Sequence, residues 1–271
     1  MIQGFIRTLL GVAVVAAFTG SAAAQDSKVA DELAKYREAR ADGNPADLLE
    51  VKGAALWAEK RGPKNASLER CDFGLGPGKL DGAYAQLPRY FKDTGKVMDV
   101  ESRLVHCMVT LQGFKQEDAT RLWFSKPGTE SEIEALVTII GAKSNGMPIN
   151  VLATHPEEKK MYQSGEYGFY RRSGPKDFSC AICHGRDGKR IRLQELGNLT
   201  TKEGAGTAMK SWPSYRVSQG AVWTMERRLI DCMRQARFPE PKYLSDSIIA
   251  LQVYLQKNAT GTVMETPGIK R

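Results

Sequence analysis

The chain has 271 residues, of which 42% are hydrophobic and 26% are charged, and its formal net charge is +8. This is the composition of an ordinary globular protein, and the length is enough for one large or two small domains. The basic residues are scattered and form no stripe interleaved with aromatic residues, which argues against a nucleic-acid-binding protein. A basic surface of this kind favours anionic substrates or acidic protein partners.

The first 24 residues have the pattern of a secretory signal peptide. Arg7 is followed by an apolar run over 9–18, and Ala22-Ala23-Ala24 forms a cleavage site of the A-x-A type. The run is about ten residues long, against the ~20 that a membrane-spanning helix needs, and no later stretch qualifies as a span. We therefore expect residues 1–24 to be removed and the mature protein to lie in the periplasm, an oxidising compartment that permits disulfides.

Most of the mature chain has helical periodicity, and no run of alternating strands is evident. The segments expected to be helical are 29–40, 47–60, 100–112, 130–142, 223–234 and 245–256. Connections that contain Gly and Pro separate these segments. The sequence thus predicts a mainly α fold.

Residues 180–184 read Cys-Ala-Ile-Cys-His, the attachment signature of a c-type haem. The thiols of Cys180 and Cys183 lie one helical turn apart and can form thioethers with the two haem vinyl groups, and His184 then becomes the proximal iron ligand. The alternatives are a zinc half-site and a thioredoxin-like redox pair. Zinc would need further Cys or His residues nearby, and a redox pair gives no reason for His184. We expect one covalent haem c.

A long internal repeat divides the chain in two. Residues 103–108 (Arg-Leu-Val-His-Cys-Met) recur 125 residues later at 228–233 (Arg-Leu-Ile-Asp-Cys-Met). The repeat predicts two tandem domains related by duplication, over 25–150 and 151–271, joined near 148–160. Only the second has the haem motif, because Gly74 and Leu75 stand in the first where a second thiol and a His would be needed.

The remaining cysteines are odd in number, so one is left unpaired. Cys71 and Cys107 correspond to one haem thiol and to Cys232, positions that lie close to the haem in a haem-bearing copy. Without haem, the two are expected to come together and form a disulfide. Cys232 then remains, on a helix about fifty residues after the haem motif, where small c-type cytochromes place the second axial ligand. Met233 and Met225 are alternative ligands, but we favour Cys232.

The chain resembles SoxA, the larger subunit of the SoxAX cytochromes of bacterial thiosulfate oxidation. The resemblance covers nearly the whole mature chain. It is carried by the haem motif at 180–184, by both copies of the Arg-…-Cys-Met segment, and by Leu-Pro-Arg-Tyr-Phe at 87–91 and Gly-Ala-Tyr-Ala at 82–85. The absence of a haem motif in the first copy places the chain with the monohaem members of the family.

The resemblance implies an L-cysteine S-thiosulfotransferase, which couples thiosulfate oxidatively to the terminal cysteine of the SoxYZ carrier protein. Electrons would leave through haem to a small c-type cytochrome, and the partner in a heterodimer would be the haem subunit SoxX. The family's axial cysteine carries a persulfide and maps onto Cys232. Its substrate-binding arginine maps onto Arg228.

The residues themselves give Arg228 two possible roles. Arg228 and Cys232 are four positions apart on a helix and share a face, so Arg228 is suited to binding a dianion such as thiosulfate beside the sulfur. It is equally suited to a structural ion pair with Glu226 or Asp231. His106 and His155 are expected to be ordinary polar residues. The competing function is a simple electron-transfer cytochrome without a substrate site; the missing first haem motif argues against a dihaem peroxidase.

Overall fold

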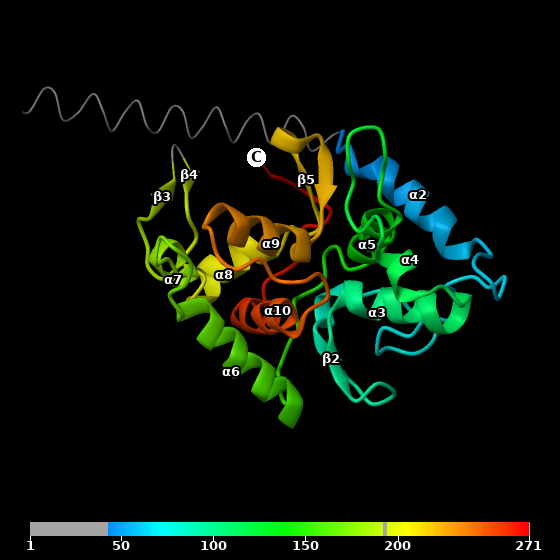
Figure 1. Cartoon of the computed structure of the whole chain (residues 1–271), viewed down its shortest axis with the longest axis horizontal. Helices are drawn as coiled ribbons and strands as arrows, with labels where there is room; N and C mark the ends of the chain where they lie inside the picture. Colours follow the sequence, from blue (N-terminus) through cyan, green and yellow to red (C-terminus); the bar gives the residue numbers. More distant parts are fainter. Residues whose placement is uncertain (1–42, 192–193, 271) are drawn as a thin grey trace, which may run out of the picture. The chain divides into compact units, whose positions relative to one another are not determined.

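The protein is described by a computed structural model that covers residues 43–191 and 194–270, and this part of the chain is mainly helical (Figure 1). The signal peptide expected at 1–24 and the helix expected at 29–40 lie outside these residues. The helices are α2 (Ala46–Ala58), α3 (Val100–Cys107), α4 (Gln116–Thr120), α5 (Glu132–Ala142), α6 (Pro156–Tyr170), α7 (Cys180–His184), α8 (Lys202–Met209), α9 (Met225–Gln235) and α10 (Asp246–Asn258).

Short strands lie between the helices. They are β1 (Arg89–Phe91), β2 (Lys96–Met98), β3 (Arg190–Ile191), β4 (Gln194–Glu195), β5 (Ser214–Arg216), β6 (Ala221–Trp223) and β7 (Gly268–Lys270). Strands β1 and β2 form one antiparallel hairpin, β3 and β4 a second, and β5 pairs with β6 in a third; β7 adds to β5 in parallel. These strands are two or three residues long, too short to produce an alternating pattern in the sequence, which is why they were not predicted.

The two halves of the chain repeat the same elements in the same order. Tyr90 pairs with Val97 in the first hairpin, and Tyr215 pairs with Val222 in the third, so the register recurs 125 residues along the chain. A capped helix follows each hairpin at once: α3 after Asp99 and α9 after Thr224. We call α2–β1–β2–α3–α5 the first copy and α6–β5–β6–α9–α10 the second copy.

In each copy, two helices pack against each other and cross at a glycine. Helix α2 packs on α5 and α6 packs on α10. A Cβ atom at Gly53 would stand 2.2 Å from the carbonyl oxygen of Ala135, and one at Gly165 would stand 2.0 Å from that of Ala250. Only glycine permits backbones to approach so closely, and the two crossings are therefore equivalent in detail.

One hydrophobic core joins the copies. A single cluster of buried side chains includes Leu104 and Leu136 of the first copy and Trp223 and Leu251 of the second, and Pro45–Arg271 form one compact unit. The division into domains at 25–150 and 151–271 stays a prediction. None of the helices in the described ranges has both the length and the apolarity to cross a bilayer.

Most of the expected helices lie within two residues of observed ones, but the prediction and the structure differ at several places. The segment expected at 100–112 is α-helical only to Cys107 and continues as a wider π-helix over Met108–Gln112. Trp223 lies in β6, because α9 begins only after the Thr224 cap. Helices α4, α6 and α8 were not predicted, and α6 begins at Pro156, inside the join expected at 148–160. Few side chains of α6 are fully buried, and polar residues dominate its sequence.

Candidate functional site

The haem motif forms the single-turn helix α7. Ser179 precedes it, and the backbone N–H of Gly185 closes the turn on the carbonyl of Ala181, 2.8 Å away. The thiols of Cys180 and Cys183 are both free and partly exposed. Because one turn separates them, they stand on the same side of the helix, as two thioether bonds to one porphyrin require.

His184 is held in the orientation of an iron ligand. Its Nδ1 lies 3.0 Å from the carbonyl oxygen of Gly197, to which it donates, and its own carbonyl accepts from the N–H of Leu199 at 2.8 Å. Anchoring Nδ1 leaves Nε2 as the free ligating atom. Burial, followed by the positive charge of Arg228, lowers the pKa of His184, which favours the neutral imidazole that binds metal.

Cys232 lies near the motif, on the second turn of α9. The thiols of Cys180 and Cys183 both belong to its electrostatic surroundings, as do Arg228 and Arg216. Burial raises the pKa of the Cys232 thiol, while the two arginines lower it. Burial, and next the charge of Cys232, raise the pKa of Cys180 to about 12. A free thiol thus interacts electrostatically with the thiols of the haem motif and with two fixed positive charges.

The two methionines considered as alternative ligands pack in the main hydrophobic core. Met225 is 3% exposed and belongs to the main hydrophobic core, and Met233 packs against the same core. Both methionine side chains therefore contribute to packing of the core. Cys232 is a free thiol that interacts electrostatically with Cys180 and Cys183, which favours it as the second iron ligand.

Arg228 has a looser set of partners than a structural ion pair would give it. Its Nη1 is 3.6 Å from Asp231 Oδ2, and Asp231 also accepts from Arg234 at 2.7 Å. The other expected partner, Glu226, is fully buried and accepts instead from the N–H of Leu244 at 2.8 Å. Asp231 therefore orients Arg228 without neutralising it alone, since the carboxylate is shared.

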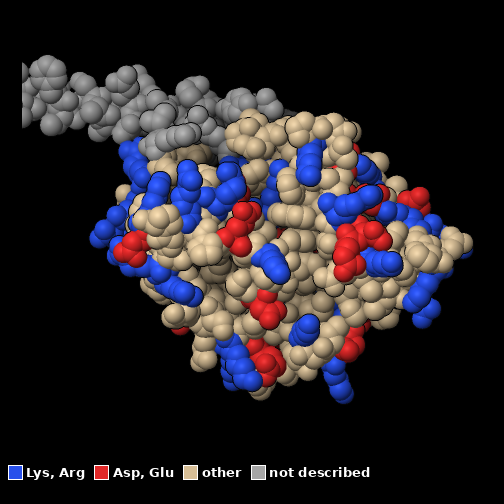
Figure 2. Space-filling view, viewed as in Figure 1, with Lys and Arg blue, Asp and Glu red and all other residues tan. Residues whose placement is uncertain are grey.

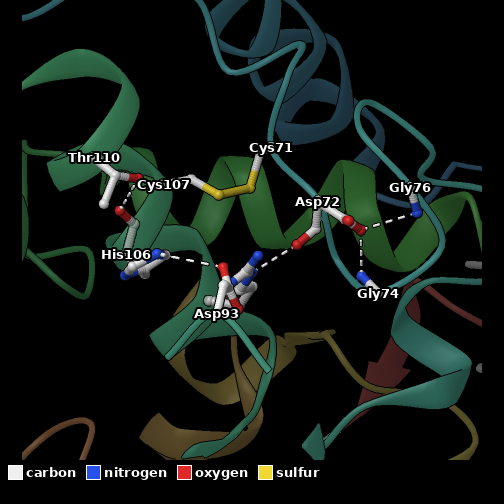
Figure 3. Close-up of a disulfide and its surroundings, with 9 residues drawn as sticks. Cys71, Asp72, Gly74, Gly76, Asp93, His106, Cys107 and Thr110 are labelled. Atoms are coloured by element: carbon white, nitrogen blue, oxygen red, sulfur yellow. Dashed lines mark hydrogen bonds and ion pairs between the residues drawn. A yellow bond between two sulfur atoms is a disulfide. The ribbon is translucent and has the colours of Figure 1, made fainter. Parts of the chain in front are cut away.

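The corresponding place in the first copy is occupied by a disulfide (Figure 3). Cys71 and Cys107 are bonded, with their Cα atoms 5.6 Å apart. The loop after Cys71 closes on the carboxylate of Asp72, which accepts from the N–H groups of Gly74 at 2.6 Å and Gly76 at 2.9 Å. A loop held by hydrogen bonds to Asp72, together with a disulfide, thus occupies the position at which the second copy has the haem motif and Cys232.

The other two histidines have structural partners. His155 accepts from the N–H of Glu157 at the start of α6, and its ring stacks on Tyr90 at 3.7 Å between centroids. His106 lies 3.9 Å from the carboxylate of Asp93 (Figure 3). His155 thus joins the start of α6 to Tyr90 of β1, and His106 has its partner within the first copy.

Two features of the site have little or no signal in the sequence. The carbonyl of Gly197 is a backbone atom and leaves no residue pattern. Arg216 comes from β5, and only an alignment of the two copies would have drawn attention to it. The buried carboxyls Glu101 and Glu226 occupy equivalent positions, and the structure brings them together, with the N–H of Glu226 donating to Glu101 Oε1 at 3.3 Å.

Positive charge gathers around this region. Figure 2 shows Lys and Arg side chains concentrated where Figure 1 has α7, the β3–β4 hairpin and α9. Exposed basic residues of these segments and of the connections next to them are Arg171, Arg172, Lys176, Arg186, Arg190, Arg234 and Arg237. Such a surface raises the local concentration of anions and steers acidic partners toward the site.

The residues fit a covalently bound haem. Two free thiols lie one turn apart, an imidazole beside them has its Nδ1 anchored, and a third thiol lies close by. The first copy does not fit one, because Gly74 and Leu75 provide neither thiol nor imidazole and Cys71 is already bonded.

Comparison with known proteins gives the same picture. The family model described as "SoxA/TsdA, cytochrome c domain" matches in two segments, 52–149 and 164–264. The chain is 51% identical to the L-cysteine S-thiosulfotransferase subunit SoxA of Hydrogenophilus thermoluteolus, over 98% of this chain and 99% of that one. It is 34% identical to the SoxA subunit of Hydrogenobacter thermophilus, with 98% of each covered.

A solved structure is also similar. The crystal structure of SoxXA from P. pantotrophus matches with a TM-score of 0.68 and 25% identity, covering 84% of this chain and 79% of that one. The two matched segments of the family model correspond to the two copies, which agrees with tandem cytochrome c-like domains.

Proposed function

Because the chain belongs to the SoxA subunits of the L-cysteine S-thiosulfotransferases, we propose that its second copy couples thiosulfate to a cysteine of a SoxYZ carrier at Cys232. In this proposal Cys180 and Cys183 would hold one covalent haem c, and His184 and Cys232 would bind its iron. The observation that carries it is the position of the free Cys232 thiol, beside the haem motif and among the charges of Arg228 and Arg216.

Arg228 binds the substrate in this proposal. Thiosulfate is a dianion whose sulfonate oxygens match the planar N–H groups of a guanidinium. Arg228 is one helical turn before Cys232, so a sulfonate held there leaves the outer sulfur facing the cysteine. Asp231, 3.6 Å from Arg228, keeps the guanidinium on this side of α9.

The reacting atom is the terminal sulfur on Cys232, either its own Sγ or the outer sulfur of the persulfide that the family implies. The positive charges of Arg228 and Arg216 oppose the effect of burial and favour the nucleophilic thiolate. A bond forms between this sulfur and the outer sulfur of thiosulfate, and two electrons are removed. Haem, when bound, supplies the one-electron acceptor through which these electrons pass to a small c-type cytochrome.

Transfer to the carrier is then a disulfide exchange. The thiolate of the carrier's cysteine attacks the sulfur next to the sulfonate, which forms the new sulfur–sulfur bond and breaks the bond to Cys232. The Cys232 sulfur leaves as an anion, stabilised by the same arginines. No proton or further oxidant is needed in this second step.

The proposed partners follow from the same surface. The basic face around α7 and α9 is suited to an acidic carrier or cytochrome, and SoxX is the proposed second subunit, as in the SoxXA structure that resembles this chain. The signal peptide expected at 1–24 assigns this assembly to the periplasm.

The test is the Cys232→Ser variant of the holoprotein in complex with SoxX. We expect haem to remain attached through its two thioethers and the transfer of the thiosulfonate group to the carrier to disappear, as measured by intact mass of the carrier. EPR should change at the same time, because a His/thiolate haem differs from a haem that has lost its thiolate ligand. Full transfer in this variant, or a His/Met spectrum in the wild type, would support a simple electron-transfer cytochrome instead.

A further inference from the structure

The first copy neutralises its arginine completely. Arg103, which corresponds to Arg228, forms an ion pair with Asp93 at 2.7 Å and donates from Nε to the carbonyl of Asp72 at 2.6 Å. Its guanidinium also lies over the ring of Phe91, 4.2 Å from the centroid. Arg103 is buried, and every one of these contacts serves to stabilise the fold of the copy without haem.

The second copy keeps the arginine and replaces both hairpin residues that hold it. Moving 125 residues along the chain from Phe91 leads to Arg216, and from Asp93 to Ser218. The carboxylate that would neutralise Arg228 is therefore absent from the hairpin, and a second cation takes the place of the aromatic ring. The same scaffold has gained positive charge where the first copy removes it.

Arg216 has no fixed anionic partner among the described residues. It is the last residue of β5, opposite Ala221, and its side chain is half-buried. Its Nε is buried without a hydrogen-bond acceptor, and so is Nε1 of Trp223 on the same face of the hairpin; the Arg216 guanidinium lies 5.5 Å from the Trp223 ring centroid. Burial, and next the charge of Arg228, lower the pKa of Arg216, while the charges of Cys232 and Asp231 oppose this shift without forming an ion pair with it. Two like charges and unused donors are unfavourable unless an anion joins them.

We propose that Arg216 is a second substrate-binding residue, which holds the sulfonate group of thiosulfate together with Arg228. The two guanidinium groups come from different elements, the β5–β6 hairpin and α9, so they can bind different oxygens of one sulfonate. Two contacts fix the direction of the sulfur–sulfur bond as well as its position, which one contact cannot do. This inference deepens the proposed function and rests on it.

The proposal also gives the site a preference for divalent oxoanions. A singly charged anion satisfies one guanidinium and leaves the second unpaired, whereas thiosulfate or sulfate satisfies both. We therefore expect the non-reacting sulfate dianion to compete with thiosulfate, and to compete much less well when Arg216 is replaced.

The experiment compares Arg216→Gln with Arg121→Gln in the haem-loaded complex with SoxX. Arg121 is exposed at the end of α4, so its variant removes the same charge away from the site. We expect Arg216→Gln to raise KM for thiosulfate about tenfold to a hundredfold, with kcat changed much less, because a charge-assisted hydrogen bond is lost. Arg216→Lys should recover part of the affinity, since it restores the charge without the planar fork.

A binding measurement separates this proposal from the chemistry. In the Cys232→Ser background coupling cannot proceed, and calorimetric titration with thiosulfate then reports binding alone. Adding Arg216→Gln should weaken this binding by the same factor, with haem content and absorption spectrum unchanged. A KM and a binding constant within twofold of those for Arg121→Gln, alongside a clear loss in Arg228→Gln, would overturn the role of Arg216 and leave the proposed function intact. Persistent transfer in Cys232→Ser would instead overturn the proposed function.

Discussion

The buried carboxyls between the copies provide a sharp test of the fold, through the substitution Glu101→Gln. Glu101 and Glu226 are both completely buried. Glu101 accepts from the N–H of Glu226 at 3.3 Å and from the hydroxyl of Tyr243 at 2.8 Å. Neither carboxyl has an ion-pair partner within the described part of the chain. Burial, and next the charge of Asp99, raise the pKa of Glu101 to about 8.

The direction of the pH dependence follows from this shift. Above the pKa of an unfolded glutamate, about 4.3, the unfolded chain has released the proton that the folded protein still holds. The free energy of unfolding therefore decreases as the pH rises, by about 1.4 kcal/mol for each pH unit per carboxyl, until the folded protein also releases the proton near pH 8. Over the whole interval Glu101 alone accounts for about 5 kcal/mol. Burial and the charges of Asp99 and Glu101 also raise the pKa of Glu226, which adds to the slope.

Glutamine has the shape of the protonated acid and releases no proton. Glu101→Gln should therefore be close to the wild type in stability at pH 5, where Glu101 is neutral, and more stable at pH 8. The assay is urea unfolding of the haem-loaded protein at several values between pH 5 and pH 8, followed by tryptophan fluorescence. Glu117→Gln, on the exposed surface of α4, is the control. Parallel pH profiles for Glu101→Gln, Glu117→Gln and the wild type would refute the assignment of a protonated Glu101.

Two further predictions concern stability. Replacing Cys71 and Cys107 together by Ala should lower the free energy of unfolding by about 4 kcal/mol in the loop-entropy model, since the bond spans 36 residues; urea unfolding measures the loss, and a change below 1 kcal/mol would contradict a structural role. Gly165→Ala should destabilise by about 1–3 kcal/mol, because the added Cβ would meet the Ala250 carbonyl 2.0 Å away. Helix propensity alone would make this variant more stable, so the sign of the change decides between the two effects.

Much of the fold was predictable because its main signals are local or repeated. The helices α2, α5 and α10 are rich in apolar residues and lie where the sequence places them. Helix α6 was missed because two glycines and many polar residues lower its apolar content, and Gly165 serves a contact with α10 that the local sequence does not record. The short hairpins were missed because strands of three residues carry no periodicity.

The candidate site was likewise predictable only in part. The haem motif and the repeat predicted which thiols are equivalent, because covalent attachment and duplication both leave residue patterns. The sequence could not predict whether Arg228 is structural or functional, since the helix that contains it has a similar sequence in both copies. The difference lies in the hairpin, where Phe91 and Asp93 of the first copy are replaced by Arg216 and Ser218. The effect of these two replacements is visible only in the structure, where Phe91 and Asp93 both contact Arg103.

The sequence by itself determined that the chain carries a haem-attachment motif, that the motif belongs to one of two duplicated halves, and that Cys232 is the cysteine left over. These are statements about residue types and spacing, which covalent chemistry and gene duplication impose along the chain. Only the tertiary structure decided that the carbonyl of Gly197 orients His184, that Glu101 meets Glu226 in the core, and that two arginines flank Cys232. Those arrangements depend on burial and on contacts between distant segments, and both arise only when the two copies pack together.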